Sequence, residues 1–148
     1  MAKTAKAPRQ KTTTRKTEVE KTRNMLAIAR HLIALGERHH SRHSIKISPV
    51  WLGSLANQFE THLNTSRPAR IVKISSEWNK EERERVMLQI LSNIRRTSMR
   101  YKKKLRMEMP PLILLDWGTR LKMLLIESSK RLEHFRDEIL NGNPVKYQ

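Results

Sequence analysis

The sequence contains no cysteine and only four glycines among its 148 residues. The absence of cysteine excludes disulfide bonds, thiolate metal ligands and cysteine nucleophiles. The glycine-rich patterns GxGxxG and GxxxxGK[ST] are also absent, which argues against a phosphate-binding loop. The longest run of leucine and isoleucine is Leu112–Leu115, far too short to cross a bilayer. No apolar secretory segment follows Met1, so we expect neither a signal peptide nor a membrane partner.

Acidic residues are scarce. The chain has 14 Asp and Glu against 31 Lys and Arg, which gives a formal charge of +17. A chain this basic needs a polyanion, and nucleic acid is the first candidate for that partner. Hydrophobic residues make up 37%, which allows the modest core of one domain.

Residues 1–17 contain no acidic residue and almost no large aliphatic side chain. Such a segment cannot bury enough apolar surface to offset its ordering entropy, so we expect a disordered basic tail that contacts nucleic acid. A solvated terminus and an organellar transit peptide are the alternatives. The cations of this tail are Lys3, Lys6, Arg9, Lys11, Arg15 and Lys16.

An accessory region is predicted over residues 18–47. Apolar side chains recur at helical spacing over 18–35, and Gly36 is a typical C-terminal stop. The linker that follows contains the pattern HHxxH, and imidazoles are common metal ligands. Because only Glu37 is nearby to complete a ligand set, we favour a solvated basic linker and assign no metal and no cofactor. The histidines concerned are His39, His40 and His43.

The remaining chain predicts an all-α core. Ser48 is a good N-cap, Pro49 fits the first helical position, and Pro110 with Pro111 ends the long helix before them. Gly118 offers a point at which the last helix divides. We see no internal repeat and no alternating strand pattern beyond short connectors. Core helices are placed at 48–63, 76–105 and 112–140, within a core over 48–140 that precedes a tail over 141–148.

The long central helix carries an apolar stripe that two shorter helices cannot cover, which predicts a partner of the same shape. In an antiparallel handshake of two such chains, the basic connector 67–73 of one chain lies beside residues 102–106 of the other. Cations then gather at the ends of the dimer, where they suit phosphate backbones rather than base edges. The expected partner interface is Leu55, Phe59, Leu63, Met87, Ile90, Leu91, Ile94, Tyr101, Trp117 and Leu121.

Three stretches give the chain a resemblance to a known family. The tail contains Lys6–Gln10, with the letters KAPRQ, followed by Thr and basic residues. Residues 56–63 read ANQFETHL, and Met109–Pro110 is followed by Ile113 and Leu115. In this order the stretches resemble the tail, the first core helix and the opening of the last core helix of the core histone of the H-three type.

The resemblance implies a divergent core histone, viral or a specialised variant, with the histone-fold layout of helix, loop, long helix, loop and helix. To this the chain adds an extra N-terminal helix and an extended C-terminal helix. The implied function is non-enzymatic packaging of double-stranded DNA into nucleosome-like particles. The implied partners are other histone-fold chains, the H-four type first. The implied location is the nucleus and its chromatin, or a virion and the host nucleus.

The resemblance also implies the DNA contacts. Loop cations and the N-terminus of the long helix would face phosphates where the minor groove turns inward, with Arg67 or Arg70 inserted. The tail lysines would bind DNA loosely and be sites of acetylation or methylation. Outside the tail cations named above, the expected contacts are Arg67, Arg70, Lys73, Ser75, Ser76, Lys102, Lys103, Lys104 and Arg106.

The sequence also departs from the family. The first core loop, 64–74, is several residues longer, and Asn64 stands where the family has its loop arginine. Leu112 replaces the acidic residue that follows the Met-Pro pair, which puts the usual contact between dimers in doubt. The last helix is much longer than that of the family.

Two other functional classes deserve comparison. A basic helical protein of a ribosome or another ribonucleoprotein fits the composition equally well, with Trp51, Trp78 and Trp117 available for base stacking. We favour a core role for Trp51 and Trp117, which lie near apolar helix starts.

An enzyme is not expected. The candidate pairs are His134 with Glu133 or Asp137, and Asp116 with Arg120. Their spacing is that of ordinary pairs on a helix surface, and no nucleophile with a base and an orienting group is visible. We therefore expect no small-molecule substrate.

Overall fold

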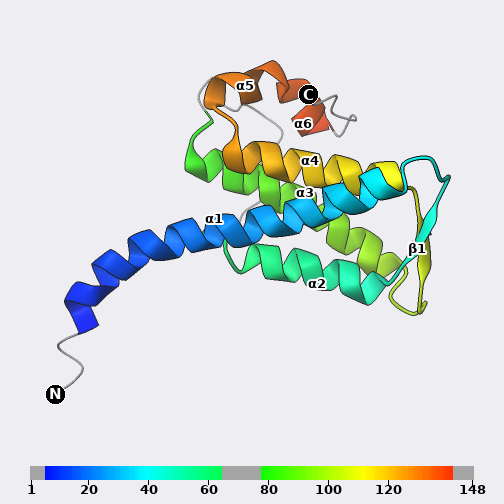
Figure 1. Ribbon diagram of the computed structural model, residues 1–148, viewed down its shortest axis with the longest axis horizontal. Coiled ribbons are helices and arrows are strands. Elements are labelled where there is room, and N and C mark those ends of the chain that lie inside the picture. The colour runs from blue at the N-terminus through cyan, green and yellow to red at the C-terminus, as the bar shows by residue number, and fades with distance from the viewer. Residues whose placement is uncertain (1–5, 65–77, 142–148) are drawn as a thin grey trace.

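The computed structural model describes the backbone over residues 6–64 and 78–141 and the side chains over 18–64 and 78–140. It confirms an all-α chain with one short two-stranded ribbon (Figure 1). The elements are α1 (Lys6–Arg38), β1 (Ile45–Ile47), α2 (Pro49–Glu60), α3 (Lys80–Arg100), β2 (Met107–Met109), α4 (Pro111–Ile126), α5 (Ser129–His134) and α6 (Arg136–Asn141).

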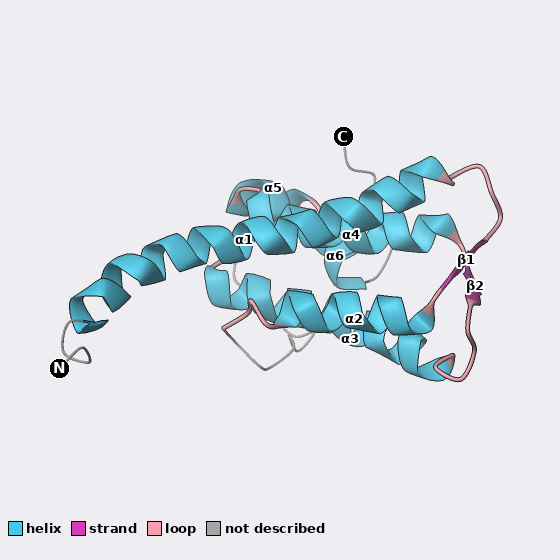
Figure 2. Cartoon of the chain, turned by 60° about the horizontal axis from the view of Figure 1, so that its bottom comes forward, coloured by secondary structure: helices cyan, strands magenta, loops and turns pink. Residues whose placement is uncertain are grey.

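The four longer helices form two layers. Helix α1 packs along α4, and α2 packs along α3, while the antiparallel ribbon of β1 and β2 bridges the layers at one end (Figure 2). One residue separates each strand from the next helix, Ser48 in the first case and Pro110 in the second. Each strand turns one face to the core, because Ile45, Ile47 and the two methionines of β2 are buried.

Local signals explain where these helices begin. The Ser48 hydroxyl accepts from the Trp51 amide at 3.3 Å, and Pro49 occupies the first turn of α2. The Asn79 side chain accepts from the Glu82 amide at 2.8 Å at the start of α3. Helix α4 begins at Pro111 without a side-chain cap.

The chain contains a structural repeat, so the expectation of no internal repeat is wrong. Helix α3 ends 62 residues after α1, β2 follows β1 by the same interval, and α4 begins 62 residues after α2. Helices α1 and α3 share the pattern R-x-M-L-x-I at Arg23–Ile28 and Arg85–Ile90. Residues 18–64 and 80–126 are therefore two copies of one unit, which we call the first half and the second half.

Burial follows the same interval. Each buried position of the first half has a buried equivalent in the second half. The pairs are Met25/Met87, Ala29/Leu91, Leu32/Ile94, Gly36/Ser98, Ile45/Met107, Ile47/Met109, Pro49/Pro111, Leu52/Leu114, Ala56/Gly118 and Phe59/Leu121. The two halves thus use one pattern of core positions filled with different side chains.

The expected roles of two glycines are wrong. Gly36 lies within α1, which continues to Arg38, and Gly118 lies within an unbroken α4. A Cβ at Gly36 would lie 2.6 Å from the Leu115 Cβ, and a Cβ at Gly118 would lie 2.7 Å from the Ala29 carbonyl oxygen. Both glycines are therefore packing residues that let α1 and α4 approach closely.

The boundaries of two predicted elements also change. The long helix ends at Arg100 rather than 105, because the chain must leave it to bring Met107 and Met109 into the ribbon. It also begins at Lys80 rather than 76, because Asn79 has extended backbone and caps the helix with its side chain. The last helix is interrupted at Glu127 and Ser128, which both have extended backbone. Ser128 is the N-cap of α5, and α6 follows α5.

Contacts of two arginines, Arg120, which is buried, and Arg83, which is partly buried, explain why the chain turns there. Arg120 in α4 pairs with Asp116 at 2.9 Å and donates to the Ile139 carbonyl of α6 at 3.3 Å. Arg83 in α3 donates to the Leu124 carbonyl at 3.1 Å, at the end of α4. Desolvation by burial lowers the pKa of Arg83 from its usual value. These bonds tie the C-terminal helices to the bundle.

The N-terminal segment differs from the expected disordered tail over its described part. Helix α1 begins at Lys6, and its first turns project beyond the other helices (Figure 1). Pro8 falls in the first turn, where amides have no helical partner, and residues 9–17 contain no further proline or glycine. The helix that is packed over 18–38 can therefore continue outward. Residues 1–5 lie outside the described residues, as does the tail expected over 141–148, except for Asn141, which ends α6.

We predict that Gly118→Ala destabilises the fold. The added methyl meets backbone of α1, which cannot move without separating the helices, and overpacking of this kind costs about 1–3 kcal/mol. Chemical denaturation measures the loss. Gly53→Ala is the matched control, because its Cβ meets only the Ser98 side chain. An equal or smaller loss for Gly118→Ala than for Gly53→Ala would contradict the close approach of α1 and α4.

Candidate nucleic-acid interface

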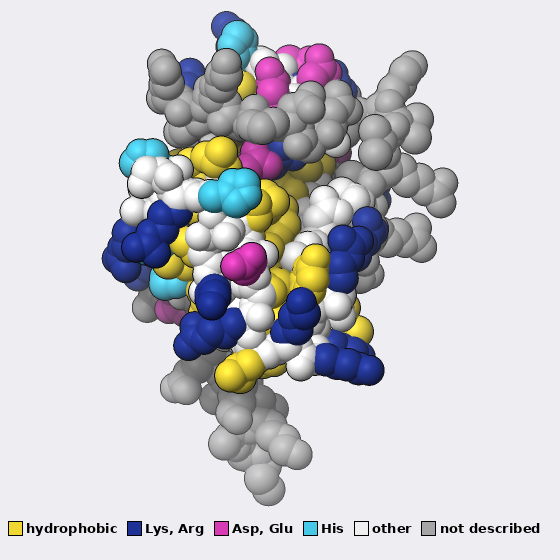
Figure 3. Space-filling view, turned by 90° about the vertical axis from the view of Figure 1, so that its right-hand side faces the viewer, with side chains coloured by type: hydrophobic (Ala, Val, Ile, Leu, Met, Phe, Trp, Pro, Cys, Tyr) yellow, Lys and Arg dark blue, Asp and Glu magenta, His cyan; other side chains and the backbone are white. Residues whose placement is uncertain are grey.

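The end of the molecule that carries the ribbon is strongly basic. Figure 3 views this end and shows Lys and Arg side chains on both of its sides, with few acidic side chains among them. We define the basic end as the exposed cations of the ribbon, of the two loops that lead into it and of the helix ends before them. They are Arg38, Arg42, Lys46, Arg100, Lys102, Lys103, Lys104 and Arg106.

The fold brings these cations together from two distant segments. Helices α1 and α3 both end here, at Arg38 and Arg100, where a positive side chain favours the negative end of the helix dipole. A loop of equal length then leads from each helix into its strand. Because β1 pairs with β2, the loops 39–44 and 101–106 lie on either side of one ribbon.

The cations of the basic end form no ion pair within the described part of the chain, although Lys46 lies opposite Glu108 in the ribbon. Several cations elsewhere form ion pairs, as in Arg95 with Glu60, Arg120 with Asp116, and Arg136 with Glu133. At the basic end, the Lys104 ammonium instead makes a cation–π contact with the Tyr101 ring, 5.6 Å from its centroid. Unpaired positive charge held on a folded end is available to an external anion.

The structure places the predicted nucleic-acid contacts in three groups. Lys102, Lys103, Lys104 and Arg106 are exposed at the basic end. Lys6, Arg9, Lys11, Arg15 and Lys16 lie along the first turns of α1. Arg67, Arg70, Lys73, Ser75, Ser76 and Lys3 lie outside the described residues.

Sequence reasoning missed half of this surface. The expected neighbour of residues 102–106 was the connector 67–73 of a partner chain, whereas the segment that shares this end of the molecule with them, on the other side of the ribbon, is 39–46 of the same chain. Arg38, Arg42 and Lys46 are therefore new candidate contacts. The signal that could have found them is the 62-residue interval, which aligns Arg38 with Arg100 and Arg42 with Lys104.

The premise that the long helix needs a partner is wrong, because its stripe is buried within the chain, where α3 packs against α2 and α4. Six residues of the expected partner interface are buried in the chain's own core, and the other four are partly buried against it. The first set is Phe59, Met87, Ile90, Leu91, Ile94 and Leu121. The second set is Leu55, Leu63, Tyr101 and Trp117.

The three tryptophans and the histidine-rich loop are the remaining candidate binding residues from the sequence. Trp78 is fully buried, and Trp51 and Trp117 pack partly buried against the core, so none lies bare on the surface. The edge of the Trp51 ring contacts His31 with centroids 5.6 Å apart. Over the described residues, His, Asp and Glu form no group of three or more that could hold a metal ion.

The expected enzyme candidates have structural contacts. Asp116 and Arg120 form the buried pair described above, and Glu133 pairs with Arg136 at 3.1 Å. The edge of the His134 ring contacts the neighbouring Phe135 with centroids 4.9 Å apart. These contacts account for Asp116, Arg120, Glu133 and His134 by packing.

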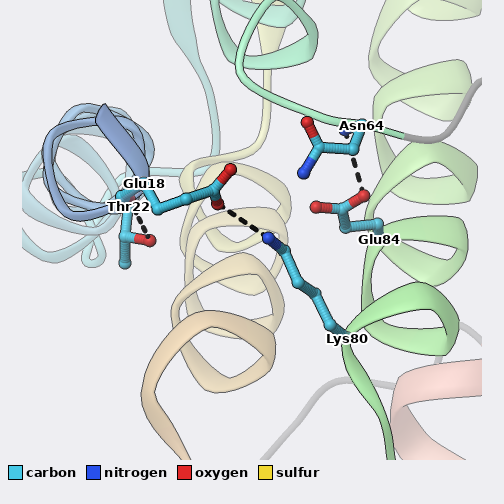
Figure 4. A network of polar contacts seen from close by, with 5 residues as sticks. All are labelled: Glu18, Thr22, Asn64, Lys80 and Glu84. Atoms are coloured by element: carbon cyan, nitrogen blue, oxygen red, sulfur yellow. Dashed lines mark hydrogen bonds and ion pairs between the residues drawn. The ribbon is translucent and has the colours of Figure 1, made fainter. Parts of the chain in front are cut away.

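The end of the bundle opposite the basic end is held by polar contacts (Figure 4). Glu18 of α1 accepts from the Lys80 ammonium of α3 at 2.7 Å. The Glu84 carboxylate accepts from the Asn64 amide at 3.0 Å, just after α2. The Lys80 hydrogen bond holds the pKa of Glu18 below its usual value.

Comparisons of the chain with protein-family models, with curated proteins and with solved structures gave no match. The resemblance to H-three-type histones therefore stays a prediction. Among the described helices, none is both long and apolar enough to cross a bilayer.

We predict that Lys80→Met raises the pKa of Glu18 toward its usual value. The lowered pKa means that this carboxylate stabilises the fold above its unfolded pKa of about 4.3 and loses that effect as pH falls through its folded value. Both side chains are substantially exposed, so the loss at neutral pH is at most about 1 kcal/mol. Carbon-detected NMR titration of Glu18 measures the shift, and an unchanged pKa would show that the pair does not persist in solution.

Proposed function

We propose that this protein binds the phosphate backbone of nucleic acid through the basic end and packages DNA in this way, without catalysing a reaction. The observation that carries the proposal is the gathering of eight exposed cations, for which the described chain shows no ion pair, from two segments about 60 residues apart. Lys and Arg that neutralise phosphates release counterions, which supplies binding energy without reading base sequence.

The composition supports this proposal. A charge of +17 on 148 residues opposes compaction of the free protein and draws it to a polyanion. The cationic turns at the start of α1 add a second basic element that projects from the bundle. The histone resemblance favours DNA among polyanions. Because the core is closed within one chain, we propose that the protein acts without a histone-fold partner at the residues first expected to hold one.

We predict that replacing Lys102, Lys103 and Lys104 together by Gln weakens DNA binding in a salt-dependent way. The slope of log K against log salt should fall by about 2.7, since each lost phosphate contact removes about 0.9. Titrations of a fluorescent duplex at several salt concentrations measure it.

The matched control replaces three exposed cations outside the basic end, Arg23, Arg30 and Lys130, by Gln. This variant loses the same net charge, so it separates a local contact from general attraction. Equal changes in slope for the two triple variants would contradict binding at the basic end.

We also predict that the chain alone protects duplex DNA from micrococcal nuclease. Addition of a histone of the H-four type should leave the protected lengths unchanged, because the stripe it would cover is already buried. Protected lengths on the order of 60–150 base pairs that require the added histone would restore the two-chain interpretation. Tighter binding to structured RNA than to duplex DNA would replace packaging of DNA by a ribonucleoprotein role.

A further inference from the structure

The two halves are related by an approximate twofold axis. In the ribbon, Lys46 lies directly opposite Glu108, and Ile45 and Ile47 lie opposite Met109 and Met107. Lys46 and Glu108 are equivalent residues, 62 positions apart. A residue meets its own equivalent only on a twofold axis, so the axis passes between these two.

A second contact lies on the same axis. Glu18 and Lys80, joined by the 2.7 Å ion pair, are also equivalent residues. They lie 20 residues before the ends of α1 and α3, which is about 30 Å along each helix. The axis therefore runs the length of the bundle, from the Glu18–Lys80 pair to the ribbon.

At each of the two positions on the axis, the two equivalent residues carry opposite charges. In a symmetric pair of identical units, each of these two positions would place two like charges side by side, which is unfavourable across a ribbon. Here Glu18 meets Lys80, and Lys46 faces Glu108. The pairing of unlike halves within one chain thus agrees with the closed core.

The axis leaves the molecule at the middle of the basic end. A twofold axis of an antiparallel ribbon is perpendicular to it, and the ribbon turns its isoleucines and methionines inward and Lys46 with Glu108 outward. At the exit point one positive and one negative side chain offset each other. The positive charge lies in two flanks beside the axis: a first flank at Arg38 and Arg42, and a second at Arg100, Lys102–Lys104 and Arg106.

We propose that the basic end docks on duplex DNA with this axis along a local twofold of the duplex, so that the first flank contacts one strand and the second flank the other. The inference rests on the proposed function and names the form of nucleic acid that the site takes. Antiparallel strands are related by twofold axes, and two charged flanks with a neutral centre match two phosphate chains separated by a groove. A single strand has no such symmetry and can follow only one flank.

Equivalent positions provide matched variants for the test. Arg38 and Arg42 of the first flank correspond to Arg100 and Lys104 of the second. The double variants Arg38→Gln/Arg42→Gln and Arg100→Gln/Lys104→Gln each remove two exposed cations that make no ion pair in the described structure. Thermal unfolding checks that both variants keep the fold.

The experiment measures the salt slope of each variant on a duplex and on a single strand of the same length. On the duplex, each double variant should lower the slope by about 1.8, and the two losses should add in the quadruple variant. On the single strand, the first-flank variant should change the slope little, because the second flank holds more cations. A duplex with uncharged methylphosphonate linkages on one strand should behave like the single strand.

The outcomes separate this inference from the proposed function. If the first-flank variant leaves the duplex slope unchanged while the second-flank variant lowers it, docking on both strands is overturned and binding at the basic end stands. If the first-flank variant lowers the slope equally on duplex and single strand, docking across the axis is likewise overturned. If neither double variant changes any slope, both proposals fail.

Discussion

The antiparallel pairing of β1 with β2 is the contact on which the arrangement of this protein depends. It is only three residues long on each side, yet it joins the two halves at the place where both change direction. Its inward side chains extend the helical core, and its outward side chains lie at the centre of the basic end. Without this pairing the two basic loops would be unrelated surface segments, and their cations would not form one surface.

The helices also join the two halves, because each of the four longer helices packs on a helix of the other half. Helix α1 of the first half packs on α4 of the second, and α3 of the second half packs on α2 of the first. Each half therefore exposes an apolar stripe that only the other half covers, which is the situation of subunits in a symmetric dimer. Gly36 against Leu115, and Gly53 against Ser98, are equivalent close contacts, and the first half supplies the glycine in both. The covalent link lets the halves diverge in charge while they keep their shape.

The pairing of charged side chains differs along the length of the molecule. Around the bundle, five arginines are matched by nearby carboxylates, so they contribute to helix and interhelix contacts. At the ribbon end, the positive side chains are left without that compensation. Repulsion among them costs the free protein some stability, and a phosphate backbone relieves it. This contrast is a better guide to a binding surface than the net charge, since a charge of +17 by itself says nothing about where a partner lies.

The sequence by itself determined the helical class, the start of α2 at its Ser-Pro cap, and the basicity that points to nucleic acid, because these depend on composition and on neighbours within a few residues. It also indicated residues 102–106 as a binding segment. Only the tertiary structure decided that residues 38–46 join them, that the apolar stripe is covered within the chain, and that the chain is a repeat. The reason is physical: equivalent core positions need equal burial rather than identical side chains, so Ala29 stands for Leu91 and Ala56 for Gly118. Strand pairing between segments 62 residues apart leaves no local pattern by which to predict it.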